Sequence, residues 1–390
     1  MRKARIRDVL GVPLSCDAGL AEELHSPQNE RRQGRASSRR AVGILTFHRC
    51  INYGSYWQAR CLVEGLRSFG CDAVLLDHDA AEVRKAEFRC ALQPLLPVSS
   101  DASDVLSYAR KTRLFLDAIA HLPRSSRFDL HVPVLTESFD LIVVGSDEVW
   151  NLHHPWYGGF TAFFGHGLAS RKLISYAASF GNQDATDGLA VEWAARLERF
   201  DRISVRDENS RCMIRNALGF EPSLVLDPCL QFPPQIAPAE NDEEPYVLVY
   251  GHSFPDWFAR RIRGAARERG LRLLSIGYRN DWADEQRIAA GPEEFARLMA
   301  GAAAVATNFF HGCVFAFLNG RPLVCVPSAY RSNKIHDLTA ALGAEQHLVD
   351  EDSSELQYSA LLELQPEIAA KLADLRRDSS AFLTHVLECA

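Results

Sequence analysis

The fold is decided within residues 41–77, which read AVGILTF at 41–47, WQARCLVEGLRSF at 57–69 and CDAVLLD at 71–77. The first and last runs are short, apolar and bounded by polar or turn residues, so both predict buried strands. Between them, Cys61, Leu62, Leu66 and Phe69 recur at helical spacing, and Gly70 ends the predicted helix. Strand, loop, helix and strand in succession form a βαβ unit, which predicts a parallel sheet.

The same alternation continues along the chain. Further strands are predicted at 139–145, 172–177, 202–205, 223–226, 246–250, 271–276, 302–307 and 322–327. Helices are predicted at 185–198, 210–218, 257–269 and 293–299, whereas the weaker signal in 79–136 predicts helices that cover the sheet or form a lid. Residues 232–244 concentrate prolines and acids, as exposed linkers do.

These elements predict an α/β fold with two Rossmann-like parallel-sheet domains that face a cleft, at residues 41–231 and 245–353. A chain of 390 residues is also too long for one ordinary core. Residues 354–390 predict two amphipathic helices, around 361–368 and 370–387, that pack back on the first domain. Residues 1–40 predict a mobile basic leader, and a contact between this leader and anionic lipid or a partner is the alternative to a solvated tail.

The composition excludes several classes of protein. A net charge of −7 argues against a nucleic-acid binder, which needs a basic face. The sequence has no apolar stretch of about 18 residues and no signal-peptide run, so we expect no transmembrane segment and a cytoplasmic location. The ten cysteines show no CxxC spacing and lie in apolar segments, so reduced thiols and no metal site are predicted.

Chemistry in parallel sheets is found in the loops that follow the strands. The strand at 302–307 runs into Asn308 and then His311 and Gly312, where a helix begins. A helix N-terminus favours a phosphate or carboxylate, and a histidine beside that anion can donate a hydrogen bond or a proton. Lys334 follows one loop later and could reach the same anion, although Arg331 competes for this role and a solvated lysine is the plain alternative.

Three loops of the first domain offer further candidates. Gly54 permits a close approach of backbone to ligand, but its loop lacks the glycines of GxGxxG, so no dinucleotide site is predicted. Ser146 and Asp147 could either cap the following turn or bind substrate hydroxyls. Arg206 ends a strand and suits a carboxylate or phosphate, with a salt bridge to Asp207 or Asp227 as the structural alternative.

Seven segments in order resemble the polysaccharide pyruvyl transferase family, from about residue 42 to 338. They read GILTFHRCINYGSYWQ, FDLIVVGSDEVWN, LISYAASFG, ISVRDENS, LVLDPCL, PEEF and TNFFHGCVFAFLNGRPLVCV. The resemblance implies a fold like that of the B-type glycosyltransferases (GT-B-like) and no cofactor other than the donor substrate, phosphoenolpyruvate. It also implies a sugar or glycan acceptor, which can be lipid-linked, and a pyruvate ketal as product.

Carried onto matching positions, the resemblance implies that His311 and Arg206 contact the donor and take part in proton transfer. Lys334 would bind the donor phosphate, together with Asn308 and Gly312 beside the motif histidine. On the acceptor side, the implied residues are Asn52, Gly54, Ser146 and Asp147.

Phe309, Cys313 and Glu148 depart from the family pattern, which has Ser or Thr near the motif histidine and Gln in place of the glutamate. These changes leave the acceptor and the final product open. Two other functions stay open as well: a nucleotide-sugar glycosyltransferase, because fold does not fix function, and a non-catalytic glycan-assembly protein of the same fold.

Overall fold

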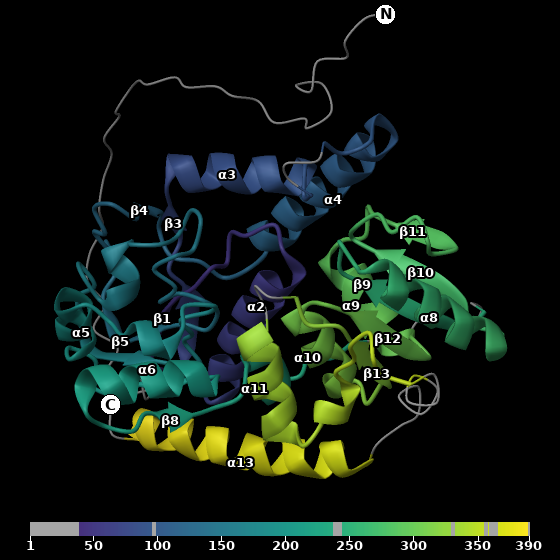
Figure 1. The fold of residues 1–390 in the computed structure, drawn as a ribbon. Coiled ribbons are helices and arrows are strands. Elements are labelled where there is room, and N and C mark those ends of the chain that lie inside the picture. Colours follow the sequence, from purple (N-terminus) through teal and green to yellow (C-terminus); the bar gives the residue numbers. More distant parts are fainter. Residues whose placement is uncertain are drawn as a thin grey trace, which may run out of the picture. The chain divides into compact units, whose positions relative to one another are not determined.

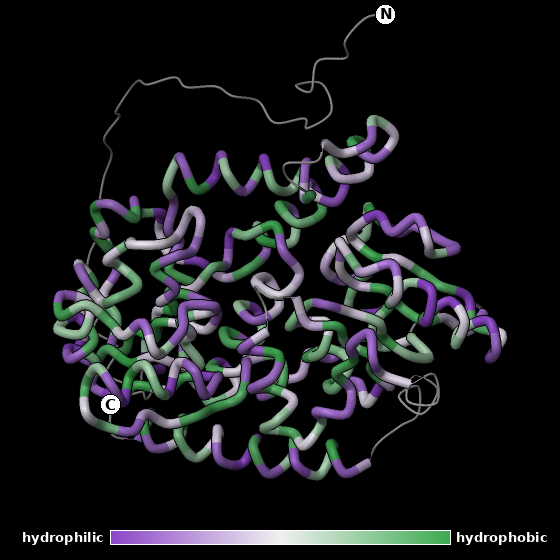
Figure 2. Tube along the Cα trace, viewed as in Figure 1, coloured by the Kyte–Doolittle hydropathy of each residue, from purple (hydrophilic) through white to green (hydrophobic). Residues whose placement is uncertain are grey.

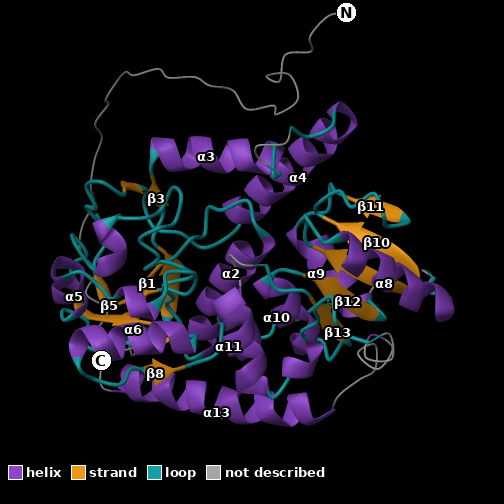
Figure 3. Ribbon diagram, viewed as in Figure 1, coloured by secondary structure: helices purple, strands orange, loops and turns teal. Residues whose placement is uncertain are grey.

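Two parallel sheets form the framework of the chain (Figure 3). The computed structural model describes residues 39–95, 99–236, 244–328, 332–354, 358 and 366–388. The first sheet has the order β2-β1-β5-β6, from β1 (Ala41–Leu45), β2 (Asp72–Leu75), β5 (Phe139–Val144) and β6 (Ser170–Ser175). The second has the order β11-β10-β9-β12-β13, from β9 (Tyr246–Tyr250), β10 (Arg272–Ile276), β11 (Glu285–Arg287), β12 (Ala304–Thr307) and β13 (Leu323–Cys325).

In both sheets the strand order reverses beside the first strand. This reversal lies between β1 and β5 in one sheet and between β9 and β12 in the other. Ligands of open parallel sheets bind at the carboxyl ends of strands on either side of such a reversal. The two Rossmann-like halves predicted from the sequence are therefore confirmed, and they correspond to the predicted GT-B-like class.

Short strand pairs extend the first half. The pair β7 (Ser204–Val205) and β8 (Ser223–Leu224) is joined to the first sheet through single bridges, and β3 (His78–Asp79) pairs with β4 (Phe128–Asp129). The first half also carries α2 (Tyr53–Ser68), α3 (Ala81–Leu92), α4 (Ala102–Ala120), η1 (Thr161–Phe164), η2 (Ala185–Asp187), α5 (Val191–Leu197), α6 (Glu208–Leu218) and α7 (Pro228–Gln231). The remaining helices are α8 (Asp256–Glu268), α9 (Pro292–Gly301), α10 (Phe310–Leu318), α11 (Ser332–Leu342), η4 (Glu345–His347) and α13 (Pro366–Glu388) (Figure 1).

The hydrophobic core is continuous between the two sheets. Alternate residues of a strand point to opposite faces, so Ile44 of β1 packs in the same cluster as Leu248 of β9, while Leu45 faces a separate cluster. Helix α2 joins the halves, because the Trp57 indole donates to the Pro292 carbonyl at 3.1 Å. The Tyr53 ring stacks on Phe295 with centroids 4.2 Å apart. This shared core fixes the strand ends of both sheets relative to one another.

Several element boundaries differ from the sequence prediction. The helix predicted at 185–198 is wrong in its first half, where a single turn at Ala185–Asp187 precedes α5. Helix α2 begins at Tyr53 rather than at Trp57, because the Asn52 side chain caps it. Helix α13 covers the helix predicted around 370–387 and begins earlier, at Pro366, while the helix predicted around 361–368 lies mostly outside the described residues.

Helix α13 alternates hydrophilic and hydrophobic positions along its length (Figure 2), as expected of a helix with one buried face. Its Ser379 hydroxyl accepts from the Leu226 backbone at 2.9 Å, and Phe382 lies 6.4 Å from Tyr176 between ring centroids. The helix thus contacts the first half. Among the helices that the structure describes, none is long and apolar enough to cross a membrane.

Three regions of the sequence prediction lie wholly or partly outside the described residues. These are the leader, of which only residues 39 and 40 are described, most of the linker, at residues 237–243, and Arg331. The described parts of the linker, 232–236 and 244–245, contain no helix or strand. Eight cysteines fall within the described ranges and form no disulfide.

Candidate active site

The carboxyl ends of the strands enclose a cavity of about 400 Å³. Its walls come from the loops after β1, β5, β7, β9, β10 and β12, and from helices α3, α4, α10 and α11. Five residues that the sequence singled out line it together: Asn52, Asp147, Arg206, His311 and Lys334. These residues are up to 282 positions apart in the chain (334 − 52), and the two strand-order reversals bring them to one place.

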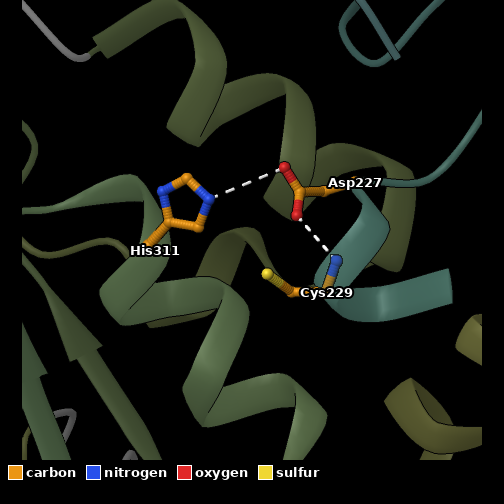
Figure 4. A group of neighbouring side chains, drawn as sticks. All are labelled: Asp227, Cys229 and His311. Atoms are coloured by element: carbon orange, nitrogen blue, oxygen red, sulfur yellow. Dashed lines mark hydrogen bonds and ion pairs between the residues drawn. The ribbon is translucent and has the colours of Figure 1, made fainter. Parts of the chain in front are cut away.

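His311 lies in the first turn of α10, and its ring packs against the backbone of α2. A Cβ atom on Gly54 would lie 2.0 Å from the imidazole Nδ1, so only glycine at this position admits the ring. The other nitrogen, Nε2, lies 3.7 Å from Asp227 Oδ2 (Figure 4) and is buried without a hydrogen bond to any residue that the structure describes. Nδ1 packs against Gly54, and the His311 side chain lines the cavity.

Arg206 holds the loops of the first half together beneath the cavity. Its Nη1 donates to Asp227 Oδ2 at 2.9 Å and to Ser146 Oγ at 3.3 Å, and its Nη2 lies 3.4 Å from Asp147 Oδ1. The guanidinium also covers the Phe310 ring at 4.8 Å. Burial alone would raise the pKa of the Asp227 carboxyl, but His311 and Arg206 hold it well below its usual range. Arg206 therefore forms the salt bridge to Asp227 that was the structural alternative, and it also lies on the cavity wall.

Lys334 forms the second ion pair of the cavity. Its ammonium binds the carboxylate of Glu148, and each side chain is about one tenth exposed. Asn151 donates to the other oxygen of Glu148 at 3.0 Å. Burial alone would raise the pKa of Glu148, but Lys334 lowers it to about 2. The Glu148 carboxylate is therefore charged at neutral pH, where it is the partner of the Lys334 ammonium.

Asp147 and Ser146 fix the loop that follows β5. Asp147 has a φ of 75°, a left-handed conformation that is uncommon outside glycine. Its carboxylate accepts from the Ser55 hydroxyl at 2.7 Å and from the backbone of Glu148 at 2.9 Å. Ser146 is fully buried and donates to the Ala177 carbonyl at 3.1 Å. Ser146 thus supports Arg206 from below the cavity, whereas Asp147 reaches the cavity wall.

Asn52 serves as the N-cap of α2. Its Oδ1 accepts from the backbone of Gly54 at 2.8 Å and of Ser55 at 3.2 Å. Gly54 itself does not belong to the residues that line the cavity, because the His311 ring covers it. The acceptor-side role predicted for this pair therefore stays a prediction, while the structure gives both residues a part in placing His311.

Asn308 and Gly312 lie behind the cavity wall. Asn308 donates to the His252 carbonyl at 2.8 Å, and its Oδ1 is buried and unpaired beside Gly251. The Gly312 N–H donates to the Phe309 carbonyl at 3.0 Å. A Cβ at Gly312 would lie 2.1 Å from the Thr307 hydroxyl. The geometry thus gives Gly312 a packing role, and the predicted phosphate contacts of Asn308 and Gly312 stay predictions.

Two buried charged groups on the cavity wall escaped the sequence prediction, Glu87 of α3 and Lys111 of α4. The Glu87 carboxylate accepts from the Trp156 indole at 2.9 Å and from the Ile51 backbone at 3.3 Å, and burial raises its pKa. Lys111 donates to the Gly277 carbonyl at 2.9 Å. Neither lies in a motif, since both sit on helices with ordinary amphipathic sequence.

Asp227, Cys229 and His311 could in principle hold a metal ion, because their ligand atoms all lie within 4.8 Å of one another (Figure 4). Arg206 donates to the same Asp227 oxygen at 2.9 Å, so a metal there would sit beside a guanidinium cation. Burial and the nearby Cys61 and Asp227 raise the pKa of Cys229, which disfavours the thiolate that a metal needs. The donor set fits a metal poorly, and a metal-independent site stays a prediction.

The sequence matches the model of the polysaccharide pyruvyl transferase family over residues 52–330, which is more than half of the chain. The chain belongs to this family. The match includes His311, Arg206 and Asp147 and ends before Lys334, so the lysine is placed in the site by the structure and not by the family match. As a member of a transferase family named for polysaccharides, the protein is expected to act on a sugar or glycan.

Solved structures with a similar fold share little sequence with this pyruvyl transferase family member. UDP-GlcNAc 2-epimerase from Methanocaldococcus jannaschii aligns with a TM-score of 0.48 and 11% identity, over 90% of this chain and 99% of its own. MurG of Acinetobacter baumannii gives a TM-score of 0.40 and 11% identity over 90% and 100%. The glycosyltransferase SnogD from Streptomyces nogalater gives 0.38 and 13% over 88% and 96%. A search of curated proteins gave no significant match.

Proposed function

We propose that the protein transfers the pyruvyl group of phosphoenolpyruvate to hydroxyls of a sugar or glycan acceptor, forming a pyruvate ketal and releasing phosphate. The observation that carries the proposal is the position of His311, which lines the cavity while its Nε2 faces the buried Asp227 carboxylate at 3.7 Å. A carboxylate behind a histidine orients the ring and stabilises the imidazolium form, as general acid catalysis requires.

The reaction begins with a proton transfer. Nδ1–H of His311 gives its proton to the methylene carbon of phosphoenolpyruvate, which becomes a methyl group and leaves an oxocarbenium-like centre at the neighbouring carbon. A first acceptor hydroxyl adds to this centre and loses its proton to the neutral imidazole. The imidazolium charge that alternates during these steps is balanced by Asp227, which Arg206 holds in place at 2.9 Å.

The second half of the reaction expels phosphate. The carbon–oxygen bond to phosphate breaks, a second acceptor hydroxyl attacks the same carbon, and its proton leaves with the phosphate. Cations stabilise the charge that develops on the departing group. Lys334 suits this role because its present partner, Glu148, is a carboxylate that a phosphate can replace at the ammonium.

The proposal is tested by incubating the purified protein with phosphoenolpyruvate and candidate glycans and measuring phosphate release and acceptor mass. We expect phosphate release that depends on both substrates, and a mass gain of one pyruvyl group. The same acceptors with nucleotide sugars test the glycosyltransferase alternative. Transfer from a nucleotide sugar, with no use of phosphoenolpyruvate, would overturn the proposal.

His311→Ala tests the assigned proton donor. We expect a loss of roughly 100-fold or more in turnover, since general acid catalysis contributes on that order. The matched control is His166→Ala, because His166 is an exposed histidine away from the cavity. Full turnover by a folded His311→Ala protein would remove His311 from the mechanism and leave the family assignment intact.

A further inference from the structure

Lys111 is a buried cation without a carboxylate. Lys111 is only 4% exposed, although its side chain lines the cavity. Nζ donates to the Gly277 carbonyl at 2.9 Å and lies 4.5 Å from the Tyr278 ring centroid and 5.3 Å from that of Tyr53. Among the residues that the structure describes, no carboxylate lies within ion-pair distance of it.

The other cations on the cavity wall are compensated. Arg206 is paired with Asp227 and approaches Asp147, and Lys334 is paired with Glu148. Two cations therefore face three carboxylates in this part of the site, so the cluster carries no surplus positive charge for an anion, even with His311 protonated. Within the described part of the chain, Lys111 is the one lysine or arginine of the cavity wall that forms no ion pair with a carboxylate.

A purely structural role explains Lys111 poorly. Helix α4 is already tied to the second half by the ion pair between Asp104 and Arg279. A buried ammonium costs several kcal/mol in desolvation, and an apolar side chain among tyrosine rings would avoid this cost. A buried ammonium that has no carboxylate partner among the described residues is explained if a bound ligand supplies the counterion.

We propose that Lys111 is an anion-binding residue of the cavity, which takes a carboxylate or phosphate group of a bound substrate. For the identity of the donor the inference rests on the proposed function. The anion has two possible sources, the carboxylate of phosphoenolpyruvate or an acidic group on the acceptor. In either case the protein would select a substrate with a negative charge at the α4 end of the cavity, away from the phosphate that Lys334 receives.

If Lys111 binds an anion, ligand binding should be accompanied by measurable proton uptake at the Lys111 amine. Burial lowers the pKa of Lys111 to about 7, and the groups around it are neutral: the phenols of Tyr53, Tyr108 and Tyr278 and the thiol of Cys90. A bound anion favours the ammonium form and raises this pKa again. At pH 8, binding should therefore take up about one proton at this side chain.

The experiment is calorimetric titration at pH 8 in two buffers of different protonation enthalpy, with phosphoenolpyruvate as one ligand. The second arm compares methyl glucuronide with methyl glucoside in the presence of phosphoenolpyruvate. The variant is Lys111→Met, and the matched control is Lys85→Met, since Lys85 is an exposed lysine of α3. We expect Lys111→Met to bind the relevant anion at least roughly 10-fold more weakly and to lose the proton uptake.

The two arms identify the source of the anion. A defect with phosphoenolpyruvate alone assigns Lys111 to the donor, and a defect limited to methyl glucuronide assigns it to an acidic acceptor. Lys111→Arg keeps the charge, so a partial recovery of affinity without proton uptake supports the same role. Equal affinities and equal proton uptake in wild type and Lys111→Met overturn the inference, as does a wild type that binds neither anion.

Failure of the proposed function is recognised separately. If the wild type binds these anions with Lys111-dependent proton uptake but never releases phosphate, the inference stands and the proposed reaction falls. If the Lys111→Met variant releases phosphate at the wild-type rate and binds its substrates with wild-type affinity, the proposed reaction stands and the inference about Lys111 falls. Thermal unfolding without ligand shows whether the variant is folded, and the loss of a buried ammonium predicts an unchanged or higher midpoint.

Discussion

Gly54→Ala offers a test of how tightly the position of His311 is set. The new Cβ would lie 2.0 Å from Nδ1 and 2.4 Å from Cγ of the imidazole, whereas ordinary contact begins at 3.4 Å. Ring and backbone would have to separate by 3.4 − 2.0 = 1.4 Å. The ring would have to move away from α2, which displaces Nδ1 from its present place and changes the 3.7 Å separation between Nε2 and Asp227 Oδ2. A misplacement of about 1 Å at a reacting group costs roughly 100-fold in rate.

The same substitution should spare the fold. Gly54 is the second residue of α2, it has no positive φ, and alanine favours a helix over glycine by about 0.5–1 kcal/mol. We expect turnover, measured as phosphate release, to fall roughly 100-fold while the free energy of unfolding changes by about 1 kcal/mol or less. Gly264→Ala in α8 is the matched control, because no atom lies within 4 Å of its Cβ. Wild-type turnover by Gly54→Ala would refute the reasoning, since the ring would then not need its present position.

Two further substitutions test the charges around the site. Burial and the nearby Asp207 and Glu208 raise the pKa of Asp337 to about 6, so the folded protein keeps a proton that the unfolded chain releases, and stability falls as pH rises through 6. Asp337→Asn should therefore gain about 1 kcal/mol at pH 8 in urea unfolding and almost nothing near pH 4, close to the carboxyl pKa of the unfolded chain; an equal gain at both would contradict the assignment. Glu148→Gln leaves the buried Lys334 ammonium without its counterion, which costs up to about 3 kcal/mol. Inorganic phosphate should then stabilise this variant more than wild type, and an equal effect on both would show that Lys334 does not receive the anion.

The alternation of strands and helices could be predicted from sequence because it depends on local patterns. Runs such as residues 246–250 are apolar throughout, as expected for strands buried on both faces, and all five residues of this run are buried. The predicted ends of helices were less accurate where a capping side chain determines the first helical residue. The first turn of α2, residues 53–56, shows no helical periodicity of its own and depends on the cap from Asn52.

Part of the candidate site could be predicted for the same reason. His311, Arg206 and Asp147 each follow a strand, and parallel strands bring such loops to one edge. Lys111 could not be found in this way. Its burial depends on Tyr53 and Gly277, which lie far from it in the chain, and a lysine within a charged helix has the sequence pattern of a surface residue.

The charge balance of the cavity links these residues into one argument about binding. Phosphoenolpyruvate carries a carboxylate and a phosphate, while Arg206 and Lys334 are already paired with carboxylates. Under the proposed function, binding of phosphoenolpyruvate therefore requires either exchange of these ion-pair partners or protonation of a further group. Exchange is available at Lys334, where a phosphate can replace Glu148, and protonation is available at Lys111, whose pKa of about 7 is set by burial. An anion that engages both lysines would have a fixed orientation in the cavity, and under the proposed function its methylene carbon would be held for the proton from His311.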